Sequence, residues 1–254
     1  MLIAALLAPA AVSAQDRSAL LLPVPSDMGA ATGRSQPGVA SASPVAFGPR
    51  WKQVFIGTGF QAETRYGGDE DGTLSLGAGF GNASRLIGIE AVITSLSTVR
   101  SGIGDRVVAS FKAFRNLPKN FAVAVGIEGI EVAGDDIETE ESFYVVGSKV
   151  ASLGSRRYFN AITLNAGVGT GRFQSEDDFL ADEDGMNVFG SAALRIAPAF
   201  AAIADWTGQD LNLALSIAPF SKVNFVISPG LADVAGQAGD GTRFTLGAGL
   251  SWRF

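Results

Sequence analysis

Two glycine-rich runs are the first segments whose residue types could do chemistry. Residues 77–81 (GAGFG) and 167–171 (GVGTG) carry glycine at every second position, with mostly apolar residues between. A phosphate-binding loop instead needs its glycines in a turn that opens a helix. Because a spacing of two places all the glycines on one face of a strand, we interpret both runs as strands and not as nucleotide-binding loops.

An acidic run is the second candidate. Asp182-Glu183-Asp184-Gly185 matches a fragment of a calcium-binding loop, but the full spacing with a terminal glutamate is missing. Asp182 and Asp184 are the metal candidates that this fragment offers. Loosely bound Ca²⁺ or Mg²⁺ at acidic loops is the only cofactor that we expect, and a solvated, self-repelling loop is the alternative.

Charged residues on the polar faces of predicted strands form the third candidate set. In a water-filled bore, opposed rows of acids and bases would select solutes by charge. The alternative is that they pair with one another, fill a narrow lumen and stabilise a barrel. Antiparallel pairing predicts Glu90 near Lys112 and Glu128 near Arg106. The pore-lining candidates are Glu63, Glu90, Arg106, Lys112, Glu128, Lys149, Arg195, Asp205 and Arg243.

The usual catalytic side chains are missing from the sequence. The 254 residues include no histidine and no cysteine, which removes the commonest general base and all thiol chemistry. We therefore expect no enzyme. The net charge of −6 also argues against a nucleic-acid partner, because such partners select basic surfaces.

The elements that must position these residues alternate with a period of two from residue 51 to residue 254. Segments of about 9–11 residues, each with one apolar and one polar or glycine-rich face, recur about twelve times, and this length suits a tilted strand that crosses a bilayer. The pattern predicts an all-β protein, a closed up-and-down antiparallel transmembrane β-barrel of about 12 strands. A soluble sandwich is the alternative. The last segment is the clearest, with an apolar face of Phe244, Leu246, Ala248, Leu250, Trp252 and Phe254.

The links between the predicted strands differ by parity. The odd-numbered links are long and acidic, and the even-numbered links are short and carry Arg and Lys but no acid. In an up-and-down barrel, parity decides the side of the membrane, with short turns on one side and long outer loops on the other. The sorting of charge therefore supports a barrel.

The N-terminal residues divide into two zones. Residues 1–14 have the apolar core and the small residues of a signal peptide, with cleavage expected after Ala14. Residues 15–50 form a Pro/Ala/Ser-rich extended tail or linker without a sustained period. This tail could hang in the periplasm or enter the barrel lumen, and the sequence leaves both open.

With these features, residues 51–254 resemble a Gram-negative outer-membrane β-barrel. The match depends on the export signal, the alternating strands and the ending Leu250, Trp252 and Phe254, which is similar to the strand signal read by the barrel-assembly machinery. The resemblance implies an outer-membrane location in contact with lipid and lipopolysaccharide. Twelve-stranded members of this class include narrow channels for nucleosides or acidic sugars and a phospholipase, and no motif here singles out one of them.

The function that we expect is a porin-like channel for passive diffusion of small hydrophilic solutes or ions through a narrow charged lumen. The alternative is a structural or interaction barrel with a closed lumen, whose acidic outer loops or N-terminal tail contact a partner. The sequence identifies neither the solute nor the oligomeric state.

Overall fold

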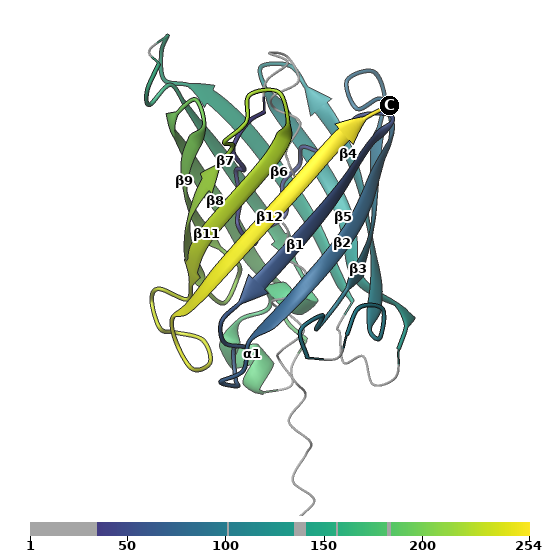
Figure 1. The fold of residues 1–254 in the computed structure, drawn as a ribbon, viewed down its shortest axis with the longest axis vertical. Helices are drawn as coiled ribbons and strands as arrows, with labels where there is room; N and C mark the ends of the chain where they lie inside the picture. The colour runs from purple at the N-terminus through teal and green to yellow at the C-terminus, as the bar shows by residue number, and fades with distance from the viewer. Residues whose placement is uncertain (1–34, 101, 135–140, 156, 182–183) are drawn as a thin grey trace, which may run out of the picture.

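The computed structural model describes residues 35–254 apart from residues 101, 135–140, 156 and 182–183. Twelve strands form one closed barrel in which each strand pairs antiparallel with its sequence neighbours and β1 pairs with β12 (Figure 1). The predicted up-and-down barrel is confirmed. The strands are β1 (Gln53–Gln61), β2 (Asp71–Gly81), β3 (Gly88–Ser95), β4 (Val107–Leu117), β5 (Phe121–Ala133), β6 (Ser142–Ser152), β7 (Ala161–Gly169), β8 (Asn187–Ala197), β9 (Phe200–Trp206), β10 (Leu211–Ile217), β11 (Asn224–Ala232) and β12 (Arg243–Arg253).

The two faces of the strands differ in the way that the alternation predicts. On β12 the outward side chains of Phe244 and Trp252 are exposed, whereas Arg243 and Ser251 on the opposite face are buried. Successive side chains of a strand point to opposite sides of the sheet. The period-two pattern therefore places the large apolar side chains outside the barrel and the polar or small ones inside.

The barrel has two unlike ends. The links that follow β2, β4, β6, β8 and β10 meet at the short-turn end, at the top of Figure 1, and the other links meet at the long-loop end. The β9–β10 link departs from the predicted parity, because it has only residues 207–210. Thr207 closes it as a tight turn: its N–H donates to the Asp210 carbonyl, and its hydroxyl accepts from the Asp210 N–H, both at 3.0 Å.

The β7–β8 link folds back into the barrel. It contains a short 3-10 turn, η3 (Gly171–Phe173), and the helix α1 (Glu176–Leu180). Phe173 is completely buried and stacks on Phe189 with ring centroids 4.3 Å apart, in a cluster that includes Tyr144 and Ala46. No described helix is both long and apolar enough to cross a membrane.

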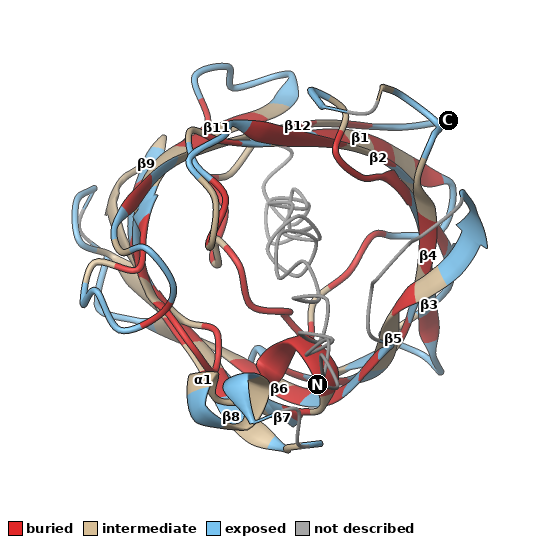
Figure 2. Cartoon of the chain, turned by 90° about the horizontal axis from the view of Figure 1, so that it is seen from below, coloured by how far each residue is buried: buried red, intermediate tan, exposed pale blue. Residues whose placement is uncertain are grey.

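Residues 35–50, which we call the strap, lie inside the barrel, where Figure 2 shows a buried segment crossing the enclosed space. The Ser35 N–H donates to the Ser221 carbonyl at the short-turn end. The middle of the strap reaches Asp205 on β9, and Arg50 returns the chain to the short-turn end before β1. This part of the predicted tail is therefore in the lumen. The predicted signal peptide, residues 1–14, lies outside the described residues.

Candidate functional site: the barrel lumen

The carboxylate of Asp205 on β9 anchors the strap. Its Oδ2 atom accepts from three consecutive strap amides, those of Ser41 at 2.7 Å, Ala42 at 2.8 Å and Ser43 at 3.1 Å. The Ser43 hydroxyl donates to Oδ1. Asp205 is completely buried, and successive backbone amides provide a ready anion site. Charge assistance makes these hydrogen bonds stronger than neutral ones, so Asp205 is the strongest single link between wall and strap.

Side chains from six other strands also bond the strap backbone, and one of them is Gln53 at the start of β1, which accepts from the Arg50 N–H at 3.1 Å. The strap's small residues allow this close approach: a Cβ atom added at Gly48 would lie 2.6 Å from the ring of Phe114 on β4. The wall thus holds the strap from most of its circumference. The other five wall residues that bond it are Lys112 on β4, Ser148 on β6, Asn165 on β7, Ser191 on β8 and Ser216 on β10.

An ion pair joins β3 and β4 beside the strap. Glu90 and Lys112 are direct partners in the register, and their Oε1 and Nζ atoms lie 3.1 Å apart. This is the pairing that the sequence predicts. Both side chains are buried, and Lys112 also donates to the carbonyl of Phe47 at 3.0 Å. The pair therefore packs against the strap and does not face an open bore.

The second ion pair joins a strand to a folded-in link. Arg172 in η3 approaches Glu128 on β5 with Nε–Oε2 at 2.6 Å, and its Nη atoms donate to the Ala42 carbonyl of the strap at 3.4 Å. Its guanidinium lies 4.2 Å from the ring centroid of Phe173. The predicted pairing of Glu128 with Arg106 is wrong. The register places Leu117 opposite Phe121 and shifts twice before Val107 lies opposite Ala133, so Glu128 lies far along β5 from Arg106.

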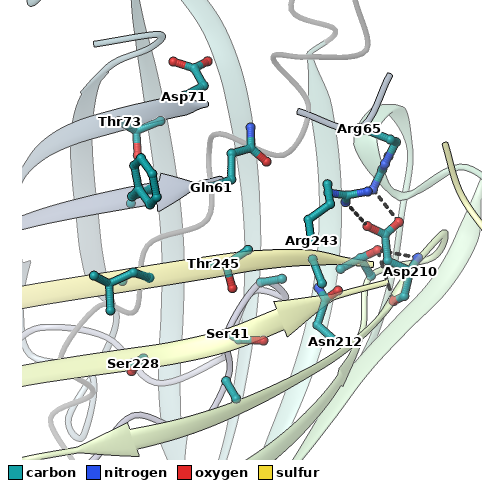
Figure 3. A pocket seen from close by; sticks show the side chains of 18 of the residues that line it. Ser41, Gln61, Arg65, Asp71, Thr73, Asp210, Asn212, Ser228, Arg243 and Thr245 are labelled. Atoms are coloured by element: carbon teal, nitrogen blue, oxygen red, sulfur yellow. Dashed lines mark hydrogen bonds and ion pairs between the residues drawn. The ribbon is translucent and has the colours of Figure 1, made fainter. Parts of the chain in front are cut away.

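A third charged cluster lies near the long-loop end (Figure 3). The Asp210 carboxylate bridges two arginines: Arg243 Nη2 lies 2.8 Å from Oδ2, and Arg65 Nη2 bonds Oδ1. Arg65 also donates to Gln209. These side chains are almost fully buried, and a buried charge of this kind requires a partner. One carboxylate shared by two guanidinium groups leaves the cluster with an excess positive charge.

Two small cavities flank the strap. One of about 80 Å³ lies beside the Asp210 cluster and Ser41, and the other of about 90 Å³ lies beside Glu90 and Lys112. Both volumes are large enough to hold several water molecules. A solute that needs more room than these cavities offer would have to displace the strap or the ion pairs.

The long loops are also clasped together. The hydroxyl of Tyr66 in the β1–β2 link donates to Glu176 Oε1 of α1, and the ring of Tyr66 stacks on Phe179. The Gly239 N–H of the β11–β12 link donates to the same carboxylate oxygen at 3.2 Å. Burial and the neighbouring Glu176 carboxylate raise the pKa of Tyr66 well above its ordinary value. The neutral phenol of Tyr66 is therefore the form that donates the hydrogen bond to Glu176.

The short-turn end has a different character. A cavity of about 880 Å³, which we call the vestibule, lies there between the strap residues Phe47 and Gly48 and the turns after β2 and β4. Among the described residues that line it, the charged ones are all basic: Arg50, Lys119, Arg195 and Arg253.

Six of the nine predicted pore-lining residues turn toward the lumen and three require comment. Glu63 lies beyond the end of β1 and is exposed, so its placement on the inner face is wrong. Arg106 lies just before β4, where it donates to Ser97 at 3.3 Å. The six are Glu90, Lys112, Glu128, Arg195, Asp205 and Arg243.

Lys149 is the last of the three predicted pore-lining residues that require comment. Its side chain was predicted to point into the lumen, and this prediction is wrong. Ser148 points inward to the strap amide of Ala46, so alternation turns Lys149 outward, and a slip of one residue exchanges the faces of a strand. Its Nζ atom reaches the carbonyl of Lys119 at the short-turn end. Such a long side chain lays its methylenes on an apolar surface while its charge reaches a polar edge.

Three lumen residues were not predicted from the sequence, because they lie in the links between strands. Arg65, Arg172 and Asp210 lie outside the strands, and period-two reasoning assigns an inner face only to strand residues. The one signal was that Arg65 and Arg172 are basic residues in otherwise acidic long links. A cation in such a link is a candidate partner for a lumen carboxylate.

Metal binding gains no geometric support from the described part of the chain. Within it, no group of three or more His, Cys, Asp or Glu side chains is placed to hold a metal ion. Of the two candidates from the sequence, Asp184 is described, and Asp182 lies outside the described residues.

The chain matches no protein-family model, and no curated protein matches it. Among solved structures it is similar to the crystal structure of the Acinetobacter baumannii outer membrane protein Omp33, with a TM-score of 0.43 and 10% sequence identity. The alignment covers 80% of this chain and 98% of that one. We carry no residue role or activity over from this similarity.

Proposed function

We propose that this chain is an outer-membrane barrel that acts as a narrow passive pore for ions and very small hydrophilic solutes, with the strap as its constriction. Support for a membrane location comes from the outer surface. Each of the twelve strands contributes at least one exposed large apolar side chain, among them Phe60, Leu76, Ile93, Phe111, Val125, Phe143, Leu164, Val188, Phe200, Leu213, Leu231 and Trp252. An apolar belt around a closed sheet is suited to lipid, where no strand edge can be left unpaired. The short-turn end would then face the periplasm.

The observation that carries the pore proposal is the pair of small cavities on the two sides of the strap, each of which borders buried charged side chains. Their volumes of about 80 and 90 Å³ suit water or a small ion. Their walls carry charged groups from the Glu90–Lys112 pair and the Asp210 cluster. Fixed charges at a constriction select ions by sign. Because most of these charges are paired, we expect modest selectivity from them.

The second candidate is a barrel that stays closed and serves for interaction. It is favoured by the number of bonds to the strap, which come from seven strands and from Arg172 in η3. In this case the acidic long loops or the N-terminal tail would contact the partner.

Planar-bilayer recording of the purified full-length protein separates the two candidates. A narrow pore gives small, regular current steps in the wild type, and the steps grow in Asp205→Ala, because the strap loses its anchor. A closed barrel gives no steps in the wild type. If folded wild type and folded Asp205→Ala are both silent, the pore proposal is wrong.

The matched control is Asp233→Ala. Asp233 is also a completely buried aspartate, and its carboxylate accepts from the backbone amides of Gln237 and Ala238 at 3.0 Å each. These amides belong to the β11–β12 link and not to the strap. A conductance change that both variants share would therefore reflect general loosening and not release of the strap.

A further inference from the structure

The vestibule at the short-turn end has room for a ligand. Its volume of about 880 Å³ is within the usual range of small-molecule sites, about 300–1,000 Å³. Its lining includes Phe47 and Gly48 of the strap, Thr163 on β7 and Ala201 on β9. It is about ten times larger than either cavity beside the strap.

The charges in the vestibule have one sign. Its lining includes Arg50, Lys119, Arg195 and Arg253, and no Asp or Glu occurs among the described residues of that lining. In the strap-filled part of the lumen, by contrast, the basic side chains are bonded to carboxylates or to the strap. The positive electrostatic potential is therefore concentrated in the vestibule, at the short-turn end of the barrel.

Arg195 is the residue best placed to use this potential. It is half-buried on the inner face of β8, and its direct neighbours across the sheet are Ala161 and Ala201. Neither alanine offers a counter-charge, and the described residues provide no ion pair or hydrogen bond for the guanidinium. Its planar fork of donors suits a phosphate or carboxylate group.

We propose that the vestibule is a binding site for a small polyanion that carries phosphate or carboxylate groups, with Arg195 as its central contact and Lys119 and Arg253 at its rim. The site does not depend on conduction, because a closed barrel would present the same cavity at its short-turn end. The proposal therefore stands or fails separately from the pore.

The test is calorimetric titration of the full-length protein, in phosphatidylcholine nanodiscs at low ionic strength, with inorganic pyrophosphate as the probe. We expect saturable binding that weakens as salt is added. Arg195→Gln should weaken it about tenfold, equivalent to about 1.4 kcal/mol, and Arg195→Lys should weaken it less. Lys222→Gln is the control, because Lys222 is exposed on the β10–β11 link at the same end and does not line the vestibule.

Absence of wild-type binding, or an equal loss in Arg195→Gln and Lys222→Gln, would overturn the proposal. A second measurement needs no variant: pyrophosphate should slow phenylglyoxal modification of Arg195 but not that of Arg157, which lies outside the vestibule. An unchanged rate at Arg195 would also overturn it.

A lipid phosphate group has the same chemistry as a soluble phosphate, and the titration can separate the two sources. Repeating it in nanodiscs that contain phosphatidylglycerol leaves the affinity for pyrophosphate unchanged if the site takes soluble anions. Loss of pyrophosphate binding in those nanodiscs, with binding retained in phosphatidylcholine, assigns the same site to an anionic headgroup.

Discussion

Removal of the Asp205 carboxylate should release the strap. In the native barrel this carboxylate accepts from the amides of Ser41, Ala42 and Ser43. Asp205→Ala removes every acceptor, and Asp205→Asn keeps one carbonyl oxygen and replaces the other with a donor. The strap should therefore spend more time out of its seat in the order wild type, Asn variant, Ala variant.

The magnitude follows from the hydrogen bonds that are lost. A hydrogen bond to a charged group contributes about 1.5–3 kcal/mol. Three such bonds to one carboxylate do not add fully, because water can hydrate the freed amides, so we take about 3 kcal/mol for Asp205→Ala. Since each 1.4 kcal/mol is a factor of ten, the released population rises by about two orders of magnitude. For Asp205→Asn, about 1.5 kcal/mol corresponds to about tenfold.

Thiol labelling measures this population directly. The natural chain has no cysteine, so Ala42→Cys introduces a unique thiol at a position that is buried in the seated strap. When seating is fast compared with labelling, the reaction rate with a small polar thiol reagent is proportional to the released fraction. The rate should rise about tenfold in Asp205→Asn and about 100-fold in Asp205→Ala.

The comparison variant is again Asp233→Ala, which removes an equally buried carboxylate from a loop. Combined with Ala42→Cys, it should leave the labelling rate of the introduced thiol near the value measured with Asp205 and Asp233 both intact. If Asp205→Ala and Asp233→Ala label at the same rate, Asp205 does not hold the strap and the reasoning is refuted.

Three further predictions concern the lumen and the loops. Lys112→Met leaves Glu90 buried without its partner and should lower the free energy of unfolding in urea by about 3–5 kcal/mol. The double variant that also carries Glu90→Gln should recover most of this loss. If it recovers none of the loss, the two residues do not act as a pair. Gly208→Ala should destabilise the barrel in the same assay by about 1–3 kcal/mol. The φ angle of Gly208 is +108°, and an added Cβ atom would lie 2.1 Å from the carbonyl oxygen of Phe173 in η3. Unchanged stability would show that the turn can relax around the methyl group. Burial and Glu176 raise the pKa of Tyr66 above 10.0, so its clasp should be intact below pH 10 and be lost as pH rises through the raised value. Glu176→Gln should move the phenolate absorbance of Tyr66, measured as a difference from Tyr66→Phe, toward pH 10, and an unmoved titration would exclude the contact.

Prediction from the sequence worked where strand geometry alone determines position. The Glu90–Lys112 pair lies on adjacent strands on either side of a single link, so counting residues with a period of two was sufficient. The same method failed for Glu128, because the β4–β5 pairing has two register shifts that move its partner. It also failed for Lys149, where a slip of one residue exchanged the inner and outer faces. Register errors of this size follow directly from the short period of a strand.

The contents of the lumen could not be predicted in this way. The strap has no periodic pattern, and its small residues are equally compatible with a free tail. Arg172 and Asp210 belong to links between strands. The path of such a link depends on its tertiary contacts with the barrel wall, which the local sequence does not specify. Only the assembled wall supplies Ser148, Ser216 and Asp205 as acceptors for the strap amides.

The sequence by itself predicted an all-β barrel of about twelve strands with an apolar outer face, because alternating side chains along each strand are a local pattern. The tertiary structure alone decided what fills the lumen and where an uncompensated charge remains. The physical reason is sequence separation: the Gly38 amide and the Ser216 hydroxyl, 178 residues apart, meet only after the sheet has closed. Contacts of that kind depend on the whole wall, and no local pattern encodes them.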